Sequence, residues 1–139
     1  IFDSWAGALS GQDMIKYSFD PINKIASEVK KRYPETPIIV FPRGVGGGYE
    51  LFSKVKHFSG LAIDSAVPAP WAANLQDKIT IQGNLDPLLL VSGGDKLKAE
   101  VKYLIYHLNN KPFVFNLGHG ITPDADPDNV SRLVEYVRT

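Results

Sequence analysis

The stretch of sequence that decides the fold is "FVFNLGHGITPDADPDNVSRLVEYV", residues 113–137. It begins with "FVF", a short apolar run typical of a strand that is buried on both faces. Asp126-Pro127 then indicates a helix start, with the aspartate as the cap and the proline at the first helical position. Apolar residues follow on one face of that helix, at Val130, Leu133, Val134 and Val137. The stretch therefore predicts a strand, a loop and a helix, in that order.

The same unit recurs along the rest of the chain. Short apolar runs predict strands at residues 38–41, 61–63 and 79–81, and "IF" at residues 1 and 2 indicates the end of another, which makes about five. Asp20-Pro21 predicts a second capped helix, which Pro34 ends, and Asp95 caps a third. Shorter helices are expected around residues 49–56 and 70–75. The apolar faces expected for the second and third helices are Ile22, Ile25, Ala26, Val29 and Tyr33, and Leu97, Val101, Leu104, Ile105 and Leu108.

Strands that alternate with helices imply right-handed crossovers and a parallel sheet, here in a single α/β domain, residues 1–139. The sheet can be open and doubly wound or curled into a barrel, and the residues alone leave both arrangements open. A complete eight-fold barrel usually needs about 250 residues. Both arrangements put functional groups at the carboxyl ends of the strands. These ends are Asp3-Ser4, Pro42-Arg43, Asp64, residues 83–86 and residues 116–119.

Composition excludes several classes of protein. Fifteen basic residues balance 15 acidic ones without a long block of either sign, so no nucleic-acid partner and no anionic membrane surface is expected. The chain has no cysteine, which excludes disulfides, thiolate metal sites and a thiol nucleophile and fits a reducing compartment. The apolar runs are too short for a membrane span and the first residues do not resemble a signal peptide, so a cytoplasmic location is expected.

His119 is the strongest candidate for a ligand-facing residue. It lies between two glycines in "NLGHG", which let the backbone turn sharply and let another molecule approach closely. Neither of the other two histidines lies at metal-ligand spacing from it, so no metal is expected. Arg43 is a second candidate, because a guanidinium can bind a carboxylate or phosphate through two hydrogen bonds. "QGNLDP", residues 82–87, fits a polar site and a turn equally well, and "GVGGGYE", residues 44–50, lacks the features of a phosphate loop.

Four segments resemble uroporphyrinogen decarboxylase, in the order and at the spacings of that family. They are "IFDSWAG" (residues 1–7), "IIVFPRGVG" (38–46), "ITIQGNLDP" (79–87) and "NLGHGITPDADPDNV" (116–130). The pair "QGNLDP" and "NLGHG" is the specific part, and the resemblance covers essentially the whole chain. It implies a (β/α) barrel of the TIM type, present only as its C-terminal portion from about the fourth strand onward. It also implies haem biosynthesis, a homodimer, and no metal or organic cofactor.

The resemblance also implies roles for individual residues. Phe2 and Ser4 match pocket residues beside the tetrapyrrole substrate, and His119 matches the histidine that contacts its side chains. The family's aspartate that gathers the pyrrole N–H groups, its N-terminal arginines and its active-site tyrosine come from earlier segments, and no residue here matches them. Asp3 stands where some relatives carry glutamate. The implied reaction decarboxylates the four acetate side chains of uroporphyrinogen to give coproporphyrinogen, and the isolated chain is expected to bind and catalyse poorly.

Two alternatives to a decarboxylase are considered. Cobalamin-linked methyltransferases resemble this fold but bind zinc through histidine and cysteine ligands, and the absence of cysteine argues against them. The chain could also be a non-catalytic piece that serves assembly or binding. In every case an incomplete barrel leaves two sheet edges and an apolar inner face uncovered. We therefore expect a homodimer or larger oligomer, with Phe2 and Ser4 near the contact.

Overall fold

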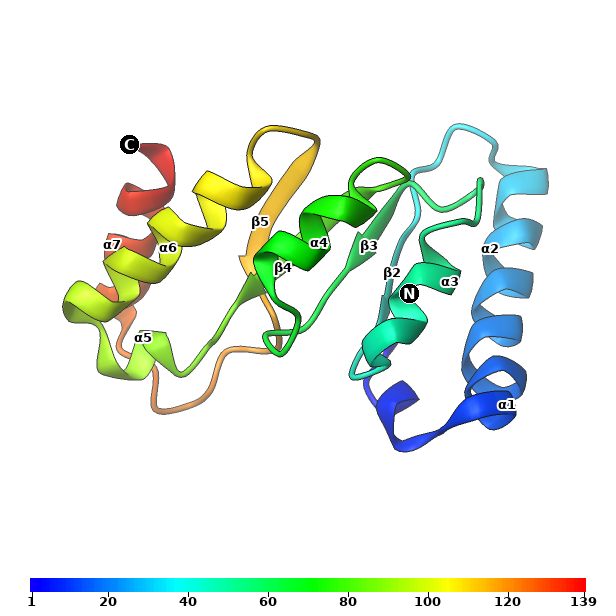
Figure 1. Ribbon diagram of the computed structural model, residues 1–139, viewed down its shortest axis with the longest axis horizontal. Coiled ribbons are helices and arrows are strands. Elements are labelled where there is room, and N and C mark those ends of the chain that lie inside the picture. The colour runs from blue at the N-terminus through cyan, green and yellow to red at the C-terminus, as the bar shows by residue number, and fades with distance from the viewer.

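Five strands form one parallel sheet in the computed structural model, which describes all residues, Ile1–Thr139. The expected strands are confirmed, although β4 (Thr80–Leu85) and β5 (Phe113–Leu117) extend four and two residues beyond the carboxyl ends of the apolar runs that predicted them. Each strand pairs with the next one in the sequence (Figure 1). The strands are β1 (Phe2–Asp3), β2 (Ile39–Pro42), β3 (Gly60–Ala62), β4 (Thr80–Leu85) and β5 (Phe113–Leu117).

The sequential strand order decides between the two arrangements that the sequence left open. In a doubly wound sheet the order reverses at a switch point, whereas here it runs β1-β2-β3-β4-β5 without reversal. Right-handed crossovers between successive neighbours put every connecting helix on the same face of the sheet. In Figure 1, α3 (Tyr49–Phe52), α4 (Ala69–Leu75) and α6 (Gly94–Leu108) lie in front of the strands, and α2 (Asp20–Arg32) and α7 (Pro127–Arg138) lie at the two ends of the row. This is the winding of a (β/α) barrel and not of an open sheet covered on both faces.

The helices confirm the predicted alternation and add segments that the sequence did not indicate. The unexpected segments are α1 (Gly11–Met14), α5 (Leu89–Ser92), a π turn at Ile15–Phe19, and two 3₁₀ turns at Ala6–Ala8 and Gly46–Gly48. The second of these 3₁₀ turns lies within the glycine-rich loop and leads directly into α3, which begins at Tyr49. The α-helices are α1 (Gly11–Met14), α2 (Asp20–Arg32), α3 (Tyr49–Phe52), α4 (Ala69–Leu75), α5 (Leu89–Ser92), α6 (Gly94–Leu108) and α7 (Pro127–Arg138).

Of the three predicted aspartate caps, only Asp126 is confirmed, since its carboxylate accepts the N–H of Asp128 at 2.9 Å. Asp20 is not a cap, because α1, the π turn and α2 are continuous and the N–H of Asp20 bonds the carbonyl of Ile15. The wider π turn accommodates Pro21, which has no N–H to donate. Asp95 is not a cap either, because α6 begins one residue earlier, at Gly94. Asp95 lies in the first turn and makes no capping hydrogen bond.

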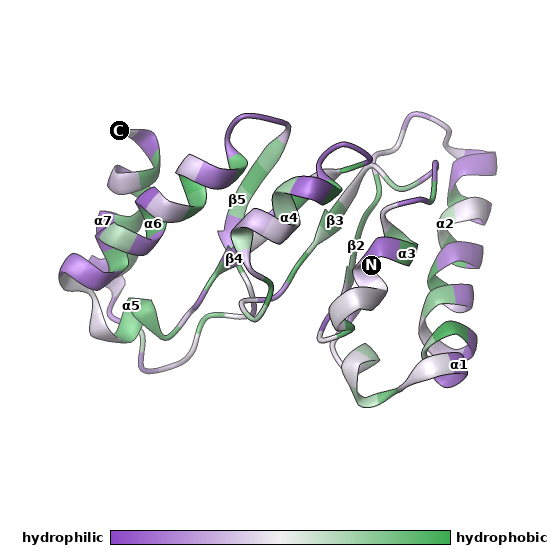
Figure 2. Cartoon of the chain, in the orientation of Figure 1, coloured by the Kyte–Doolittle hydropathy of each residue, from purple (hydrophilic) through white to green (hydrophobic).

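The hydrophobic core lies between the sheet and its helices. Val40, Leu61 and Ile81 are aligned on neighbouring strands and are fully buried on the face that the helices cover. The central helix α6 buries the side chains expected of it at Leu97, Val101, Leu104 and Leu108. Figure 2 shows this pattern, with largely hydrophobic strands and hydrophilic outer turns on α2.

The two helices at the ends of the row bury less than their sequences predicted. On α2, Ile22 and Ala26 are buried, but Ile25 is 51% exposed, and Tyr33, which directly follows the helix, is 64% exposed, contrary to expectation. On α7, Leu133 is buried and Val134 is exposed. An end helix has a neighbouring helix on one side only, so only a narrow stripe of its apolar face meets the core.

The opposite face of the sheet carries no helix. In the register of the strands, Phe41 lies beside Phe2, and Ala62, Gln82 and Val114 form a continuous row across β3, β4 and β5. Phe2 is 80% exposed, and its ring packs edge to face with the ring of Phe41, with 6.0 Å between the ring centroids. This uncovered surface corresponds to the inner face of a barrel. None of the helices combines the length and the apolar character needed to cross a membrane.

Candidate functional site

The carboxyl ends of the outer strands enclose a cavity of about 350 Å³ on the uncovered face of the sheet. Its walls bring together Phe2 and Ser4 from the end of β1 and His119 from the loop after β5. These residues are more than a hundred positions apart in the sequence and meet here because the sheet curls. The remaining lining residues are Phe41, Ala62, Gln82, Asn116, Leu117 and Gly120. Three of the four predicted site residues therefore share one cavity.

Arg43, the fourth predicted residue, lines a neighbouring cavity of about 410 Å³. Ser4 lines both cavities, so the two are adjacent along the carboxyl edge. The guanidinium of Arg43 and the imidazole of His119 make no salt bridge and donate no hydrogen bond within the chain. Both groups are therefore available to a ligand. The other residues of this second cavity are Trp5, Gly7, Ala8, Gly44, Asp64, Ser65 and Ala66.

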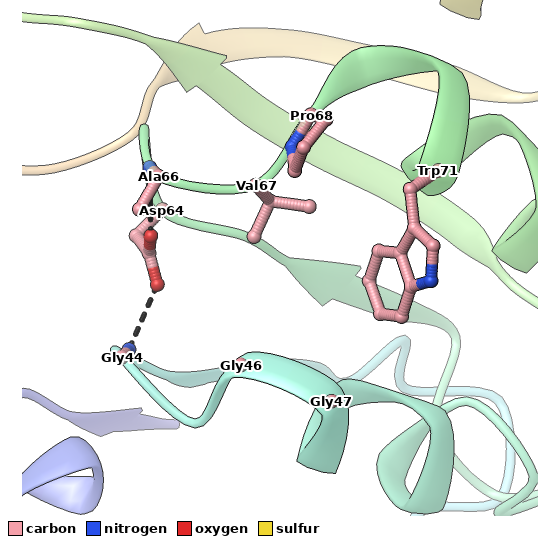
Figure 3. A pocket seen from close by; sticks show the side chains of 8 residues that line it. All are labelled: Gly44, Gly46, Gly47, Asp64, Ala66, Val67, Pro68 and Trp71. Atoms are coloured by element: carbon pink, nitrogen blue, oxygen red, sulfur yellow. Dashed lines mark hydrogen bonds between the residues drawn. The ribbon is translucent and has the colours of Figure 1, made fainter.

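A third cavity, of about 400 Å³, lies between the glycine-rich turn after β2 and the start of α4. Figure 3 shows the ring of Trp71 facing this turn and Asp64 at the other end, where the carboxylate reaches the backbone of Gly44. The walls are apolar, formed by Val67, Pro68 and the indole. Asp64 thus lies between the second and third cavities and lines both.

Asp64 is the buried carboxylate of this edge, only 7% exposed. One oxygen, Oδ2, accepts the N–H of Gly44 at 2.8 Å and the hydroxyl of Tyr49 at 2.6 Å. The other, Oδ1, accepts the N–H of Ala66 at 2.9 Å. Three donors therefore compensate the burial of the charge. Burial of Tyr49, and after it the hydrogen bond to Asp64, raises the pKa of the phenol far above its ordinary value, so Tyr49 remains a donor.

Sequence reasoning placed Asp64 at a strand end but did not find its partner Tyr49. The position of Asp64 directly after the apolar run "LAI" was the available signal. Sequence reasoning included Asn116 among the strand ends and left "QGNLDP" undecided between a polar site and a turn, but it assigned no role to Asn116 or Gln82, whose amide side chains line the cavity beside His119. Side chains along a strand alternate between the two faces of the sheet, and in "ITIQG" and "FVFNL" each amide stands between residues that face the helices. That alternation indicates that Gln82 and Asn116 face the other side.

Metal-binding side chains do not gather anywhere in the chain, since no group of three His, Asp or Glu residues lies close enough to hold an ion. His57 packs against Phe58, and His107 lies on α6 between two tyrosines. His119 is therefore the histidine of the carboxyl edge. The chemistry that this edge offers is hydrogen bonding and charge complementarity toward an anionic ligand.

Comparison with known proteins agrees with this geometry. The model of the family described as "Uroporphyrinogen decarboxylase (URO-D)" matches residues 1–139. The chain belongs to the uroporphyrinogen decarboxylase family. The uroporphyrinogen decarboxylase of Jannaschia sp. (strain CCS1) is 49% identical over 140 residues, which is 100% of this chain and 41% of that protein. Those of Paracoccus denitrificans (strain Pd 1222) and Cereibacter sphaeroides (strain ATCC 17025) are 45% and 48% identical, over 99% of this chain and 41% of each protein.

The chain thus spans about two fifths of the length of the curated family members that it matches. Five parallel strands with helices on one face agree with the part of a TIM barrel that a segment of this size supplies. The resemblance in "QGNLDP" and "NLGHG" is confirmed at the level of the family. The individual roles of Phe2, Ser4, Arg43 and His119 remain predictions.

Proposed function

We propose that the chain forms the C-terminal portion, residues 1–139, of a barrel enzyme that converts uroporphyrinogen III to coproporphyrinogen III. The observation that carries this proposal is the single cavity lined by Phe2, Ser4 and His119 at the carboxyl edge. That edge is where barrel enzymes build their active sites. In this assignment Phe2 and Ser4 contact the tetrapyrrole, and His119 and Arg43 bind its carboxylates. The names and the sequence identity of the relatives support the reaction.

The reaction needs an electron sink, which the substrate provides. A proton added to a carbon of the pyrrole ring leaves a positive iminium. The bond to the carboxyl group then breaks, its electron pair neutralises the ring, and carbon dioxide leaves. A second proton converts the exocyclic methylene into a methyl group, and the ring loses one proton, so each cycle consumes one proton. The protein must bind a polycarboxylate, stabilise the positive ring and supply protons.

The residues of this chain account for only part of that task. His119 and Arg43 can hold carboxylates, because both are free of partners within the chain. The buried carboxylate, Asp64, does not fit the stabilisation of the ring, since its oxygens already accept three hydrogen bonds. We place the group that stabilises the ring in the segment that the relatives have and this chain lacks. We also assign the enzyme to the cytoplasm and to a homodimer, without a cofactor.

The isolated chain is therefore expected to be inactive. Each missing electrostatic group is worth about 3–4 kcal/mol of barrier, so the loss of several should cost many orders of magnitude in rate. Turnover of uroporphyrinogen by the purified 139-residue chain should be undetectable in an anaerobic assay that separates the carboxylate products. Turnover near that of a full-length relative would contradict this expectation.

A chimera tests the assignment itself. This chain would replace the matching segment of the Jannaschia enzyme, to which it is 49% identical. Decarboxylation by the purified chimera supports the proposal. A folded chimera that does not turn over uroporphyrinogen would instead favour a non-catalytic assembly or binding piece, the alternative that the uncovered face of the sheet suggests. Zinc in the purified protein would favour a methyltransferase relative.

A further inference from the structure

The segment that follows the central strand, β3, contacts the loop that follows β2 and the loop that follows β5. β3 continues into the turn Asp64-Ser65, which lies between the loop of Arg43 on one side and the loop of His119 on the other. We propose that this turn is a positioning element that sets the separation of Arg43 and His119, and with it the spacing of substrate carboxylates that the site accepts. The inference rests on the proposed function. It assigns Asp64, Ser65 and Gly118 a role that involves no contact with substrate.

The first link joins the turn to the loop of Arg43. Oδ2 of Asp64 accepts the N–H of Gly44 at 2.8 Å, and Gly44 directly follows Arg43. The carboxylate is held by Tyr49, whose hydroxyl donates to the same oxygen at 2.6 Å, and by the N–H of Ala66, which donates to Oδ1. A displacement of Asp64 therefore breaks the hydrogen bond that holds the backbone of Gly44 beside Arg43.

The second link joins the turn to the loop of His119 by close packing. A Cβ on Gly118 would lie 2.3 Å from the backbone nitrogen of Ser65 and 2.9 Å from the carbonyl carbon of Asp64. Only glycine permits that approach, and Gly118 directly precedes His119. The N–H of Gly118 also donates to the carbonyl of Leu85 at 2.8 Å, which fixes the loop to the end of β4.

Two further contacts extend the same chain of links to the outer loops. A Cβ on Gly7 would lie 2.7 Å from the carbonyl oxygen of Gly44, so the loop that carries Ser4 packs on the loop of Arg43. The amide of Asn84 donates to the carbonyl of Asp64 at 2.8 Å and so ties the turn to β4. Each of these contacts involves either β4 or a residue that is at most three positions from a predicted site residue. These contacts tie the loops of the carboxyl edge to the end of β3.

The kinetic test compares the parent chimera with two single variants of it, Asp64→Asn and Gly118→Ala. Asparagine keeps the volume of Asp64 but turns an N–H toward one of its three donors, and alanine pushes the loop of His119 away from Ser65. A displacement of about 1 Å can cost about a hundredfold in rate. We expect each variant to lower kcat/KM by about thirtyfold to a hundredfold, mainly through a higher KM, because substrate binding is what Arg43 and His119 supply.

Two comparisons separate positioning from general loss of structure. Gln76→Leu is the matched control, since Gln76 is also 7% exposed and its amide bridges the carbonyls of Leu108 and Pro112 at the opposite end of the strands. It should lower the melting temperature but change kcat/KM by less than about threefold. In a chimera that already carries Arg43→Gln and His119→Asn, Asp64→Asn should also cost less than about threefold, because no group remains to be positioned. An equal cost in both backgrounds, or an equal cost for Gln76→Leu, would overturn the proposal.

Amide hydrogen exchange decides the question independently of activity. Asp64→Asn should increase exchange in the peptides that cover residues 43–48 and residues 117–121, although Asp64 bonds directly only to the first of these loops. Gln76→Leu should increase exchange in neither. If the parent chimera does not turn over uroporphyrinogen, the proposed function fails, and the exchange pattern still tests the link. Unchanged exchange at residues 117–121 in Asp64→Asn would refute it.

Discussion

Tyr49 and Asp64 form the one buried pair of titratable side chains at the carboxyl edge of the sheet. Tyr49 is fully buried on α3, and its hydroxyl donates to the carboxylate while also accepting the N–H of Asp64 at 3.3 Å. Burial and the hydrogen bond to a carboxylate both disfavour the phenolate, and both raise the pKa of Tyr49. The phenol is thereby kept as a donor over the whole physiological range of pH.

Stability should therefore fall at high pH through Tyr49. Because the folded-state pKa is raised above the unfolded value of about 10, the unfolded chain loses the phenolic proton first and binds fewer protons than the native state. The stabilisation is complete below about pH 10, and above it the free energy of unfolding should fall by up to about 1.4 kcal/mol per pH unit. Urea unfolding between pH 8 and about pH 11 measures the slope. In Tyr49→Phe the free energy of unfolding should fall less steeply with pH than in the parent chain. Equal slopes in the two proteins would contradict the assignment to Tyr49.

His119 is the residue whose predicted role is most directly testable. In the chimera, His119→Asn should lower kcat/KM by about tenfold to a hundredfold, in line with a charge-assisted hydrogen bond worth about 1.5–3 kcal/mol. The fold should remain intact, because the imidazole makes no hydrogen bond within the chain. His107→Asn, on α6, is the matched control and should leave the kinetics unchanged. Unchanged kinetics in His119→Asn would return this residue to a structural role.

At the scale of elements, three aspartates were predicted to cap helices, and the structure places each of them differently with respect to its helix. Asp126 caps α7, Asp95 lies in the first turn of α6 without a capping bond, and Asp20 lies within a continuous helix. The difference depends on what precedes each aspartate. Extended backbone at Asp126, with φ −76° and ψ 123°, frees its carboxylate to accept a helix N–H, whereas the helical backbone at Phe19 removes that possibility at Asp20.

The caps can be compared by substitution. Asp126→Ala should lower the free energy of unfolding by about 1 kcal/mol, because the N–H of Asp128 loses its acceptor. Asp95→Ala should cost about 0.3 kcal/mol, since only its interaction with the helix dipole is lost. Chemical denaturation of the two variants beside the parent chain measures both values. Equal losses would mean that the capping bond at Asp126 contributes nothing of its own.

At the scale of the whole molecule, the uncovered face and the two sheet edges dominate. β1 and β5 each pair on one side only, and Phe2 and Val114 present apolar side chains to solvent on the face without helices. Exposed edges and apolar faces of this kind favour association. A second copy of the chain can cover the same surface on both partners through a two-fold contact. We therefore expect the chain to form a homodimer or larger oligomer through this face.

Sedimentation at micromolar concentration tests this expectation. Val114→Asp should shift the chain toward the monomer, because it places a charge in the contact. Val134→Asp, on α7, is the matched control, since the two valines are 41% and 42% exposed. It should leave the sedimentation coefficient unchanged. A wild-type chain that sediments as a monomer, with well-protected amides on both outer strands, would contradict the proposal.

The sequence by itself determined the order of strands and helices and the position of the candidate site at the strand ends. Those properties follow from periodicity, caps and turns, which depend on residues close together in the chain. It placed His119 on an open turn for the same reason, since the two flanking glycines are its nearest neighbours. Among these local features the caps at Asp20 and Asp95 failed, because the preceding residues continued or began the helix, and the short segments α1 and α5 and the π and 3₁₀ turns were not indicated.

Only the tertiary structure decided which strands are neighbours, which face is covered and what holds the site together. The sequential strand order separates a barrel segment from an open sheet, and no local pattern encodes it. The exposure of Ile25 and Tyr33 depends on the place of α2 at the end of the row. The contacts of Asp64 with Gly44 and of Ser65 with Gly118 join residues 20 and 53 positions apart, and such pairs meet only after the chain has folded.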